Sequence, residues 1–224
     1  MKRSVMAAGP PYVLGVTGGI GTGKTTLVRA WVEEFEPPLI EADRLGHEAL
    51  MPGSTVYESL VARFGDEVVR TDGSIDRGRL AQIVFRDEAA LIDLNGLVHP
   101  WILERIEARV EALKASGYAG IILLDAALLL EWIHRYRPHG VVVVTAPLAD
   151  RLERLEKRGM SREESERRIS HQRPESEWTS EADWVVENTG SLEDLANTAR
   201  SLWARIRSHW KLGRTPQPGG GNAS

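Results

Sequence analysis

Short apolar runs along the chain alternate with longer segments in which apolar residues recur at every third or fourth position. Continuous apolar runs are typical of strands buried in a parallel sheet, and the longer pattern is typical of amphipathic helices. The runs predict strands at positions 12–16, 39–43, 121–125, 141–144 and 184–186. Strands alternating with helices in this way predict an α/β fold with a doubly wound parallel sheet of about five strands.

The other segments carry the helical pattern. The predicted helices cover 25–35, 44–50, most of 54–116, 148–173 and the stretch after Ser191. His99-Pro100 is expected to interrupt the long helical region, because proline lacks the amide hydrogen that a helix interior uses. Ser191 is expected to cap the last helix. The apolar face of that helix is predicted to consist of Leu192, Leu195, Leu202 and Ile206.

The most specific pattern lies between the first strand and the first helix. Residues 18–25 read Gly-Gly-Ile-Gly-Thr-Gly-Lys-Thr and satisfy G-x-x-x-x-G-K-[ST]. Glycines let backbone N–H groups curl around an anion, and the positive end of the next helix faces the same point. Lys24 is expected to reach the β and γ phosphates, and the Thr25 hydroxyl is expected to bind Mg²⁺. A nucleoside triphosphate site is predicted from Gly19, Ile20, Gly21, Thr22, Gly23, Lys24, Thr25 and Thr26.

Composition limits the classes of protein that need to be considered. With 224 residues, 42% hydrophobic and 27% charged, the chain is long enough for one good core with insertions. A net charge of -4 gives no general reason to expect nucleic-acid or membrane binding. The chain has no cysteine, which excludes disulfides and thiolate chemistry, and its histidines form no zinc-ligand pattern. The first eleven residues have no proper apolar stretch, so we expect an N-terminal extension and not a signal peptide. We therefore expect a soluble cytoplasmic enzyme.

Two aspartates end predicted strands on the side where ligands bind in such sheets. Asp43 follows the second strand, and it is placed either to take the acceptor's proton or order a metal, or to cap the next helix. Asp125 ends the third strand in the manner of the second acidic motif of phosphate-loop enzymes, where it would bind Mg²⁺. It is equally well explained as a turn residue.

Basic residues follow the fourth strand. Arg151, Arg154 and Arg158 are spaced by three and four residues, so they share one helix face. Such a stripe is usually solvated, but after a phosphate loop it favours a lid that delivers guanidinium groups to phosphates. His99, next to Pro100, is most simply a capping or core residue.

The chain resembles the dephospho-coenzyme A kinases from near its start to about residue 205. The resemblance rests on segments 15–26, 41–50, 52–53, 64–65, 72–85, 97–100, 125–131, 151–172 and 182–190. The phosphate loop is generic, but IVF, HP and the AD-x-V-x-x-N ending are specific in combination. Glu41, His47 and the absence of a proline in 125–131 depart from the family pattern.

The resemblance implies ATP-dependent phosphorylation of the ribose 3′-hydroxyl of dephospho-coenzyme A, with Mg²⁺. We expect a monomer or small homo-oligomer. Asp43 matches the acidic residue proposed as base, and Arg154 matches a lid arginine. Lys24, Asp43 and Arg154 are thus expected to be catalytic, and Arg154 and Arg158 to contact ATP. The acceptor is expected to contact Asp43, Arg77, His99 and Asp125, and the metal to contact Thr25 and Asp125.

These expectations divide the chain into functional parts. The predicted parts are a flexible extension (1–11), a nucleotide-binding core (12–43, 117–150 and 181–211), a helical acceptor domain (44–116), a lid (151–180) and a disordered tail (212–224).

Three other functions are weighed against dephospho-coenzyme A kinase activity. A GTPase is disfavoured because the chain has no N-K-x-D motif to read guanine. A non-catalytic nucleotide-binding module would leave Asp43, Asp125 and the lid without a role. A kinase for another small alcohol, such as a nucleoside, is the nearest alternative.

Overall fold

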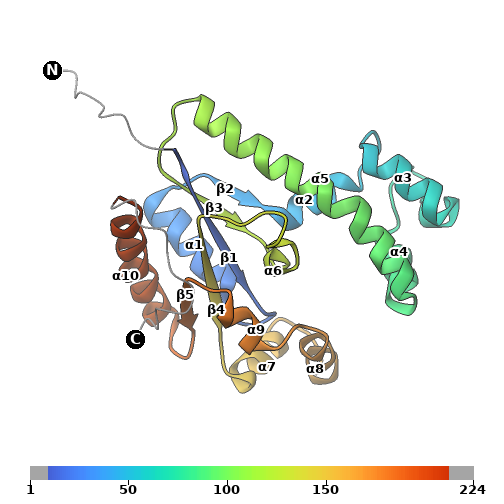
Figure 1. The fold of residues 1–224 in the computed structure, drawn as a ribbon. Helices are drawn as coiled ribbons and strands as arrows, with labels where there is room; N and C mark the ends of the chain where they lie inside the picture. Colours follow the sequence, from blue (N-terminus) through green and yellow to red (C-terminus); the bar gives the residue numbers. More distant parts are fainter. Residues whose placement is uncertain (1–9, 212–224) are drawn as a thin grey trace. The chain divides into compact units, whose positions relative to one another are not determined.

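A computed structural model describes residues 10–211 of the chain (Figure 1). Its sheet has five strands in the order β2-β3-β1-β4-β5. The pairs β1–β3, β1–β4 and β4–β5 are parallel. The strands are β1 (Tyr12–Gly18), β2 (Leu39–Glu41), β3 (Ile121–Asp125), β4 (Gly140–Thr145) and β5 (Trp184–Glu187). The predicted α/β fold with a doubly wound sheet is confirmed.

Helices connect the strands. They are α1 (Lys24–Phe35), α2 (Ala42–Ala49), α3 (Thr55–Phe64), the 3₁₀ turn η1 (Asp66–Val68), α4 (Arg77–Arg86), α5 (Glu88–Ala115), α6 (Leu129–Trp132), α7 (Leu148–Glu156), α8 (Arg162–Ser170), α9 (Glu175–Ser180) and α10 (Leu192–Lys211). The described residues form two compact units, one made of 10–40 and 113–211 and the other of 41–112. No helix in the part of the chain that the structure describes is long and apolar enough to cross a membrane.

The central strand β1 determines where polar groups gather in the first unit. Every residue of β1 is buried: β3 and β4 pair with its two edges, and side chains of α1 and α10 pack against one of its faces. Val16 of β1 is in register with Asp125 of β3, and Gly18 is in register with Val144 of β4. The parallel arrangement therefore brings the ends of β1, β3 and β4 to one edge of the sheet, where ligands bind in this class of fold.

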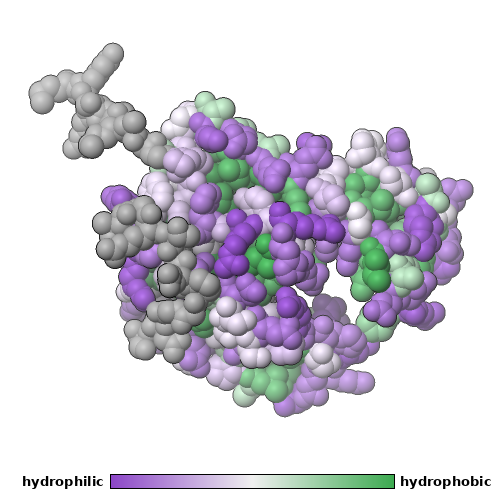
Figure 2. All heavy atoms as spheres, in the orientation of Figure 1, coloured by the Kyte–Doolittle hydropathy of each residue, from purple (hydrophilic) through white to green (hydrophobic). Residues whose placement is uncertain are grey.

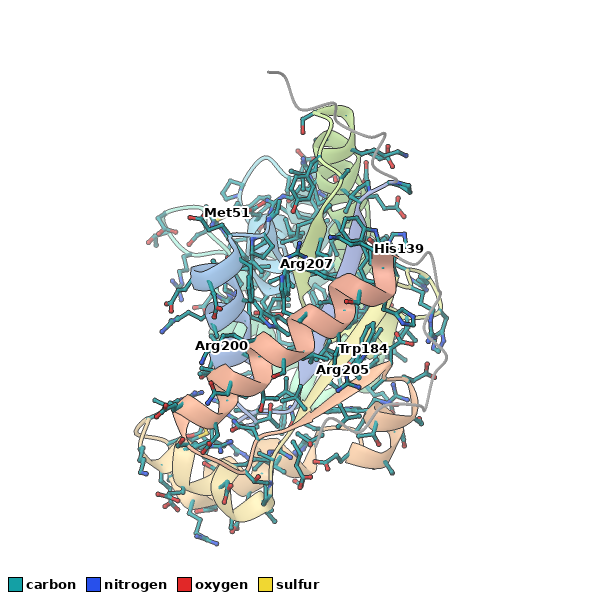
Figure 3. All side chains as sticks on the ribbon, turned by 90° about the vertical axis from the view of Figure 1, so that its left-hand side faces the viewer. Met51, His139, Trp184, Arg200, Arg205 and Arg207 are labelled. Carbon is teal, nitrogen blue, oxygen red and sulfur yellow. The ribbon has the colours of Figure 1, made fainter. Side chains whose placement is uncertain are left out.

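Helices α1 and α10 cover one face of this sheet (Figure 1). Trp31 of α1 is fully buried, and its indole N–H donates to the carbonyl oxygen of Ala199 in α10 at 2.8 Å. Phe35 stacks on Trp203 with ring centroids 4.9 Å apart. Figure 3 shows α10 crossing in front of the strands from this side. Burial of these aromatic rings gives the first unit its main core.

The start of α10 tests two predictions made from the sequence. Ser191 caps the helix as predicted, since Asp194 N–H donates to Ser191 Oγ at 3.2 Å and Ser191 N–H donates back to Asp194 Oδ2 at 2.9 Å. Leu192, however, is 76% exposed and does not belong to the apolar face. Leu192 is the first residue of α10, and the buried residues of the helix begin at Leu195.

The second unit, 41–112, has its own core. Its buried residues come from α2, α3, η1, the segment before α4, α4 itself and the start of α5; they are Ala49, Val56, Leu60, Phe64, Val68, Ile75, Leu80 and Ala90. Side chains cap three of its helices. Ser54 caps α3, Asp76 caps α4, and Asp87 caps α5 by accepting from the N–H groups of Ala89 and Ala90. The region is helical as predicted, apart from one antiparallel bridge between Val69 and Ile75.

The predicted interruption at His99-Pro100 is wrong, because Pro100 lies inside the continuous helix α5. Proline at this position removes one backbone hydrogen bond and crowds the carbonyl of residue 96, which is a glycine. Apolar contacts on both sides of the proline, from Leu94 and Leu97 and from the buried Ile102 and Ile106, hold the helix together.

Large apolar side chains also reach the surface of the second unit. Met51, Phe85 and Ile92 are each more than half exposed, and Leu91 is 40% exposed. On the face drawn in Figure 2, apolar surface (green) interrupts the hydrophilic surface in the region of α3 to α5. Exposed apolar groups of this kind suit contacts with a partly apolar ligand or partner.

Two further predictions about local structure are corrected. The segment 148–173 is not one helix but two, α7 and α8, because Gly159 (φ 87°) ends the first and Ser161 caps the second. Residue 43 does not belong to the second strand, which ends at Glu41. The predicted tail at 212–224, and all of the predicted extension except Pro10 and Pro11, lie outside the described residues.

Candidate nucleotide site

The glycine-rich segment forms a tight loop between β1 and α1. Gly21 (φ 81°) and Gly23 (φ 97°) adopt left-handed backbone conformations that side chains disfavour. Thr22 closes the turn, since its N–H and its hydroxyl donate to the carbonyl oxygen of Gly19 at 3.2 and 2.8 Å. The first residue of α1 is Lys24, so the positive end of the helix dipole lies at the loop. This geometry is that of an anion-binding site.

Lys24 is held by a carboxylate from the neighbouring strand. Its Nζ donates to Asp125 Oδ1 in an ion pair, and both side chains are only 13% exposed. Asp125 is the last residue of β3, which runs beside β1. The sheet thus places the lysine of the loop and the carboxylate of the third strand in direct contact.

Two arginines of α7 contact the loop through its carbonyl groups. Arg151 Nε donates to the carbonyl oxygen of Ile20 at 2.8 Å. Arg154 Nη1 lies 3.3 Å from the carbonyl oxygens of both Gly21 and Thr22. Arg151 is only 8% exposed, and this burial lowers the pKa of its guanidinium, partly opposed by the nearby Glu175. The alternative in which the arginine stripe forms a solvated helix face is therefore wrong for Arg151.

The third arginine of the predicted stripe does not share this face. Arg158 follows the end of α7 at Glu156 and is exposed. Thr25 and Thr26 lie in the first turn of α1, where Thr25 is exposed and Thr26 is half-buried. The structure thus brings Lys24, Asp125 and Arg154 to one loop and leaves Arg158 in the turn before α8.

Two residues that sequence reasoning did not assign also contact the loop. Asn188, just after β5, donates from Nδ2 to the carbonyl oxygen of Thr22 at 2.8 Å, and its backbone carbonyl oxygen accepts from Arg154 Nη2 at 2.9 Å. Gln172, after α8, accepts from Arg151 Nη2 at 2.7 Å and from the N–H of Ile20 at 3.1 Å. Both residues end conspicuous sequence patterns, AD-x-V-x-x-N and the arginine-rich segment, which was the signal available for finding them.

The other predicted site residues belong to the second unit. Asp43 is exposed and lies in the first turn of α2. The residue preceding that helix is Glu41, so the alternative of an N-cap role for Asp43 is wrong. Arg77 is the exposed first residue of α4, and His99 is a half-buried residue inside α5. His99 is therefore not a cap.

Comparison with known proteins identifies the family. A sequence profile of dephospho-CoA kinases matches residues 12–194, which is most of the chain and includes the loop, Asp125 and Asn188. The chain belongs to the dephospho-CoA kinase family. The predicted resemblance is confirmed, and the chain is a kinase, that is, a phosphotransferase.

Individual dephospho-CoA kinases match over nearly their whole length. The one from Leifsonia xyli subsp. xyli is 39% identical over 196 residues, which cover 87% of this chain and 98% of that protein. The one from Moorella thermoacetica is 36% identical over 210 residues, which cover 93% of this chain and 98% of that protein.

Two solved structures share the fold of this chain. TT1252 from Thermus thermophilus is 36% identical, with a TM-score of 0.73 over 88% of this chain and 99% of its own. Dephospho-CoA kinase from Campylobacter jejuni, 24% identical, shares the fold with a TM-score of 0.64 over 88% of this chain and 97% of its own.

Proposed function

We propose that this protein transfers the γ-phosphoryl group of ATP to the ribose 3′-hydroxyl of dephospho-coenzyme A, giving coenzyme A and ADP. The observation that carries the proposal is the match to dephospho-CoA kinases across residues 12–194, which contain the phosphate loop and the Lys24–Asp125 pair. Because the chain lacks cysteine and needs no oxidising compartment, we place this reaction in the cytoplasm. We expect the protein to act there as a monomer or small homo-oligomer.

The loop and its lysine are the parts of the chain that would hold the phosphates of ATP. Phosphoryl transfer depends chiefly on positioning and on neutralising charge around the moving group. The backbone N–H groups of residues 21–25 would bind the phosphate oxygens, since the N–H of Ile20 already donates to Gln172 Oε1. Lys24 would leave Asp125 and bind the β and γ oxygens instead. Arg154, half-buried and already at the loop, would add positive charge, and Arg158 is proposed to contact ATP from the turn after α7.

The donors at this edge of the sheet fit a magnesium ion. Thr25 offers an exposed hydroxyl in the first turn of α1, and Asp125 offers a carboxylate at the end of β3. Within residues 10–211, no three His, Cys, Asp or Glu side chains gather to form a complete metal cage. Magnesium bound with a nucleotide typically keeps several waters and takes only one or two protein ligands. When bound, Mg²⁺ would neutralise charge on the phosphate oxygens, and Thr25 and Asp125 would hold it.

The acceptor is assigned to residues of the second unit and to Asp125. Asp43 would receive the proton of the 3′-hydroxyl as it attacks the γ-phosphorus, which a carboxylate is able to do. Arg77 and His99 are proposed acceptor contacts, since a guanidinium and an imidazole both pair with phosphate oxygens or hydroxyl groups. The exposed Asp43 and Arg77 are open to such a ligand.

A direct assay tests the proposal. The full chain would be incubated with ATP, Mg²⁺ and dephospho-coenzyme A, and with adenosine, AMP and other small alcohols in parallel. We expect efficient transfer to dephospho-coenzyme A alone, with the new phosphate at the 3′ position by ³¹P NMR. Efficient transfer to another alcohol, with none to dephospho-coenzyme A, would contradict the assignment of the acceptor.

A further inference from the structure

Side chains hold the phosphate loop by its carbonyl oxygens. Three successive carbonyl groups are engaged, those of Ile20, Gly21 and Thr22. Arg151 binds the first, Arg154 binds the second and third, and Asn188 binds the third from its amide nitrogen. The donors come from α7 and from the end of β5, so two elements far apart in the sequence meet on the same side of the loop.

Binding the carbonyl oxygens fixes the direction of the amide hydrogens. A trans peptide unit is planar, and its N–H points opposite to its C=O. The carbonyl of Ile20 shares a peptide unit with the N–H of Gly21, and that of Thr22 shares one with the N–H of Gly23. Donors on the carbonyl side therefore turn these two N–H groups towards the other side, where an anion would bind.

The need for such support follows from the composition of the loop. Glycine has access to more backbone conformations than other residues, so a loop with four glycines between 18 and 23 loses much entropy on ordering. A loop already fixed in its binding conformation avoids that loss when the ligand arrives. Side chains that bind its carbonyl groups provide this fixation without touching the ligand.

The supporting side chains are themselves held in place. Arg151 is 8% exposed and Asn188 is 7% exposed. Gln172 completes the arrangement, because its Oε1 accepts from both Arg151 Nη2 and the N–H of Ile20. A methyl group added at Gly19 would come within 2.9 Å of Arg151 and of Gln172, so loop and side chains are in close contact.

We propose that Arg151 and Asn188 are positioning residues for phosphate binding, which hold the loop in its anion-binding conformation from the carbonyl side. Gln172 is a third positioning residue, which acts by holding Arg151 and the N–H of Ile20. All three act through the backbone of residues 20–23 and make no contact with the nucleotide. The inference rests on the proposed function only in assuming that the loop binds nucleotide phosphates; it does not depend on the identity of the acceptor.

The test measures phosphate binding without any acceptor. The full-length variants Arg151→Met, Arg151→Lys, Gln172→Leu and Asn188→Ala would be titrated calorimetrically with ADP and, separately, with pyrophosphate. Loss of a hydrogen bond that orients the loop should weaken binding of both ligands about tenfold or more. Arg151→Lys, which keeps a donor group and the positive charge, should restore part of the affinity lost in Arg151→Met.

Matched controls separate positioning from general destabilisation. Arg207→Met and Asn197→Ala change the same residue types at exposed positions of α10, where Figure 3 labels Arg207. They should leave both affinities unchanged. Titration with adenosine, which has no phosphate, should give the same weak binding in every folded variant, because the proposed residues act on the loop and not on the base.

The possible outcomes decide the proposal. Folded variants that bind ADP and pyrophosphate as tightly as the wild type would overturn it, as would an equal loss of adenosine binding. Should Asn188→Ala fail to fold, Arg151→Lys and Gln172→Leu still provide the test. A failure of dephospho-coenzyme A as acceptor would leave these measurements unaffected, so the two proposals fail separately.

Discussion

Lys24 and Asp125 form an ion pair across 101 positions of the chain, and each side chain is only 13% exposed. The pair exists because β1 and β3 run parallel and adjacent, so the loop after β1 and the last residue of β3 meet at one edge of the sheet. A lysine already paired with a carboxylate keeps a partner while no phosphate is bound, and the same carboxylate is then available for a metal.

Replacing Lys24 by alanine should remove the cation that follows negative charge onto the phosphate oxygens. We expect turnover to fall on the order of a hundredfold or more. The fold should persist, since the core of the first unit is apolar and lies behind the loop. Steady-state kinetics and circular dichroism would measure the two effects. Near-normal turnover in folded Lys24→Ala would remove the loop from the mechanism.

Replacing Asp43 by asparagine tests the proposed base. Because Asp43 lies in the first turn of α2, loss of its charge should cost only about 0.3–1 kcal/mol through the helix dipole. A missing general base typically lowers the rate by about 10²–10⁴. The melting temperature should thus fall slightly while turnover collapses and ATP still binds.

Glu58→Gln is the matched control for Asp43→Asn, since Glu58 is an exposed acid in the first turn of α3. It should show the same small change in stability with normal turnover. If Asp43→Asn also kept its activity, the base would have to be sought elsewhere, with Asp125 and Glu41 as the next candidates.

Hydrogen exchange should distinguish the two helices of the predicted lid. In α7, Arg151, Leu152 and Leu155 are buried, so its amides should be protected without ligand. In α8 the only buried residue is Ser165, and exposed pairs such as Arg168–Glu164 give little support. Its amides should exchange quickly in the free protein and slow down when ATP and acceptor bind together. Equal exchange in α8 with and without ligands would show that it is no lid.

His139 should make the folded protein sensitive to mild acid. Its Nδ1 accepts the N–H of Val13 at 2.9 Å, which requires the neutral ring, and desolvation lowers the pKa of His139 below the ordinary value of 6.5. Its contribution to stability is therefore full above pH 6.5 and is lost as the pH falls from 6.5 towards the lowered pKa.

Urea unfolding between pH 5 and 7.5 would measure this loss (about the range in which histidine titrates). His139→Asn offers Oδ1 in place of Nδ1 and does not titrate, so its stability should change less with pH than that of the wild type. His139 and His134 are both exposed residues, but only His139 accepts the N–H of Val13, so His134→Asn should keep the wild-type slope. An identical slope in His139→Asn would show that another group is responsible.

Periodicity and local motifs were sufficient for much of this molecule. The five strands, the phosphate loop and the capping of α10 by Ser191 all depend on residues within a few positions of one another. Backbone conformation and helix capping are local effects, so the sequence predicts them directly. The family resemblance followed from such local segments too, and the profile match confirms it.

Other features depended on contacts between distant segments. Pro100 remains inside α5 because apolar packing on both sides outweighs the local effect of proline. Arg151 is buried against Ile20, and Asn188 binds Thr22 across 166 positions, which no pattern along the chain reveals. Sequence alone determined that a phosphate loop forms between β1 and α1, because its glycines and its lysine are neighbours. Only the tertiary structure decided which side chains hold that loop, because their positions depend on how the sheet brings its strand ends together.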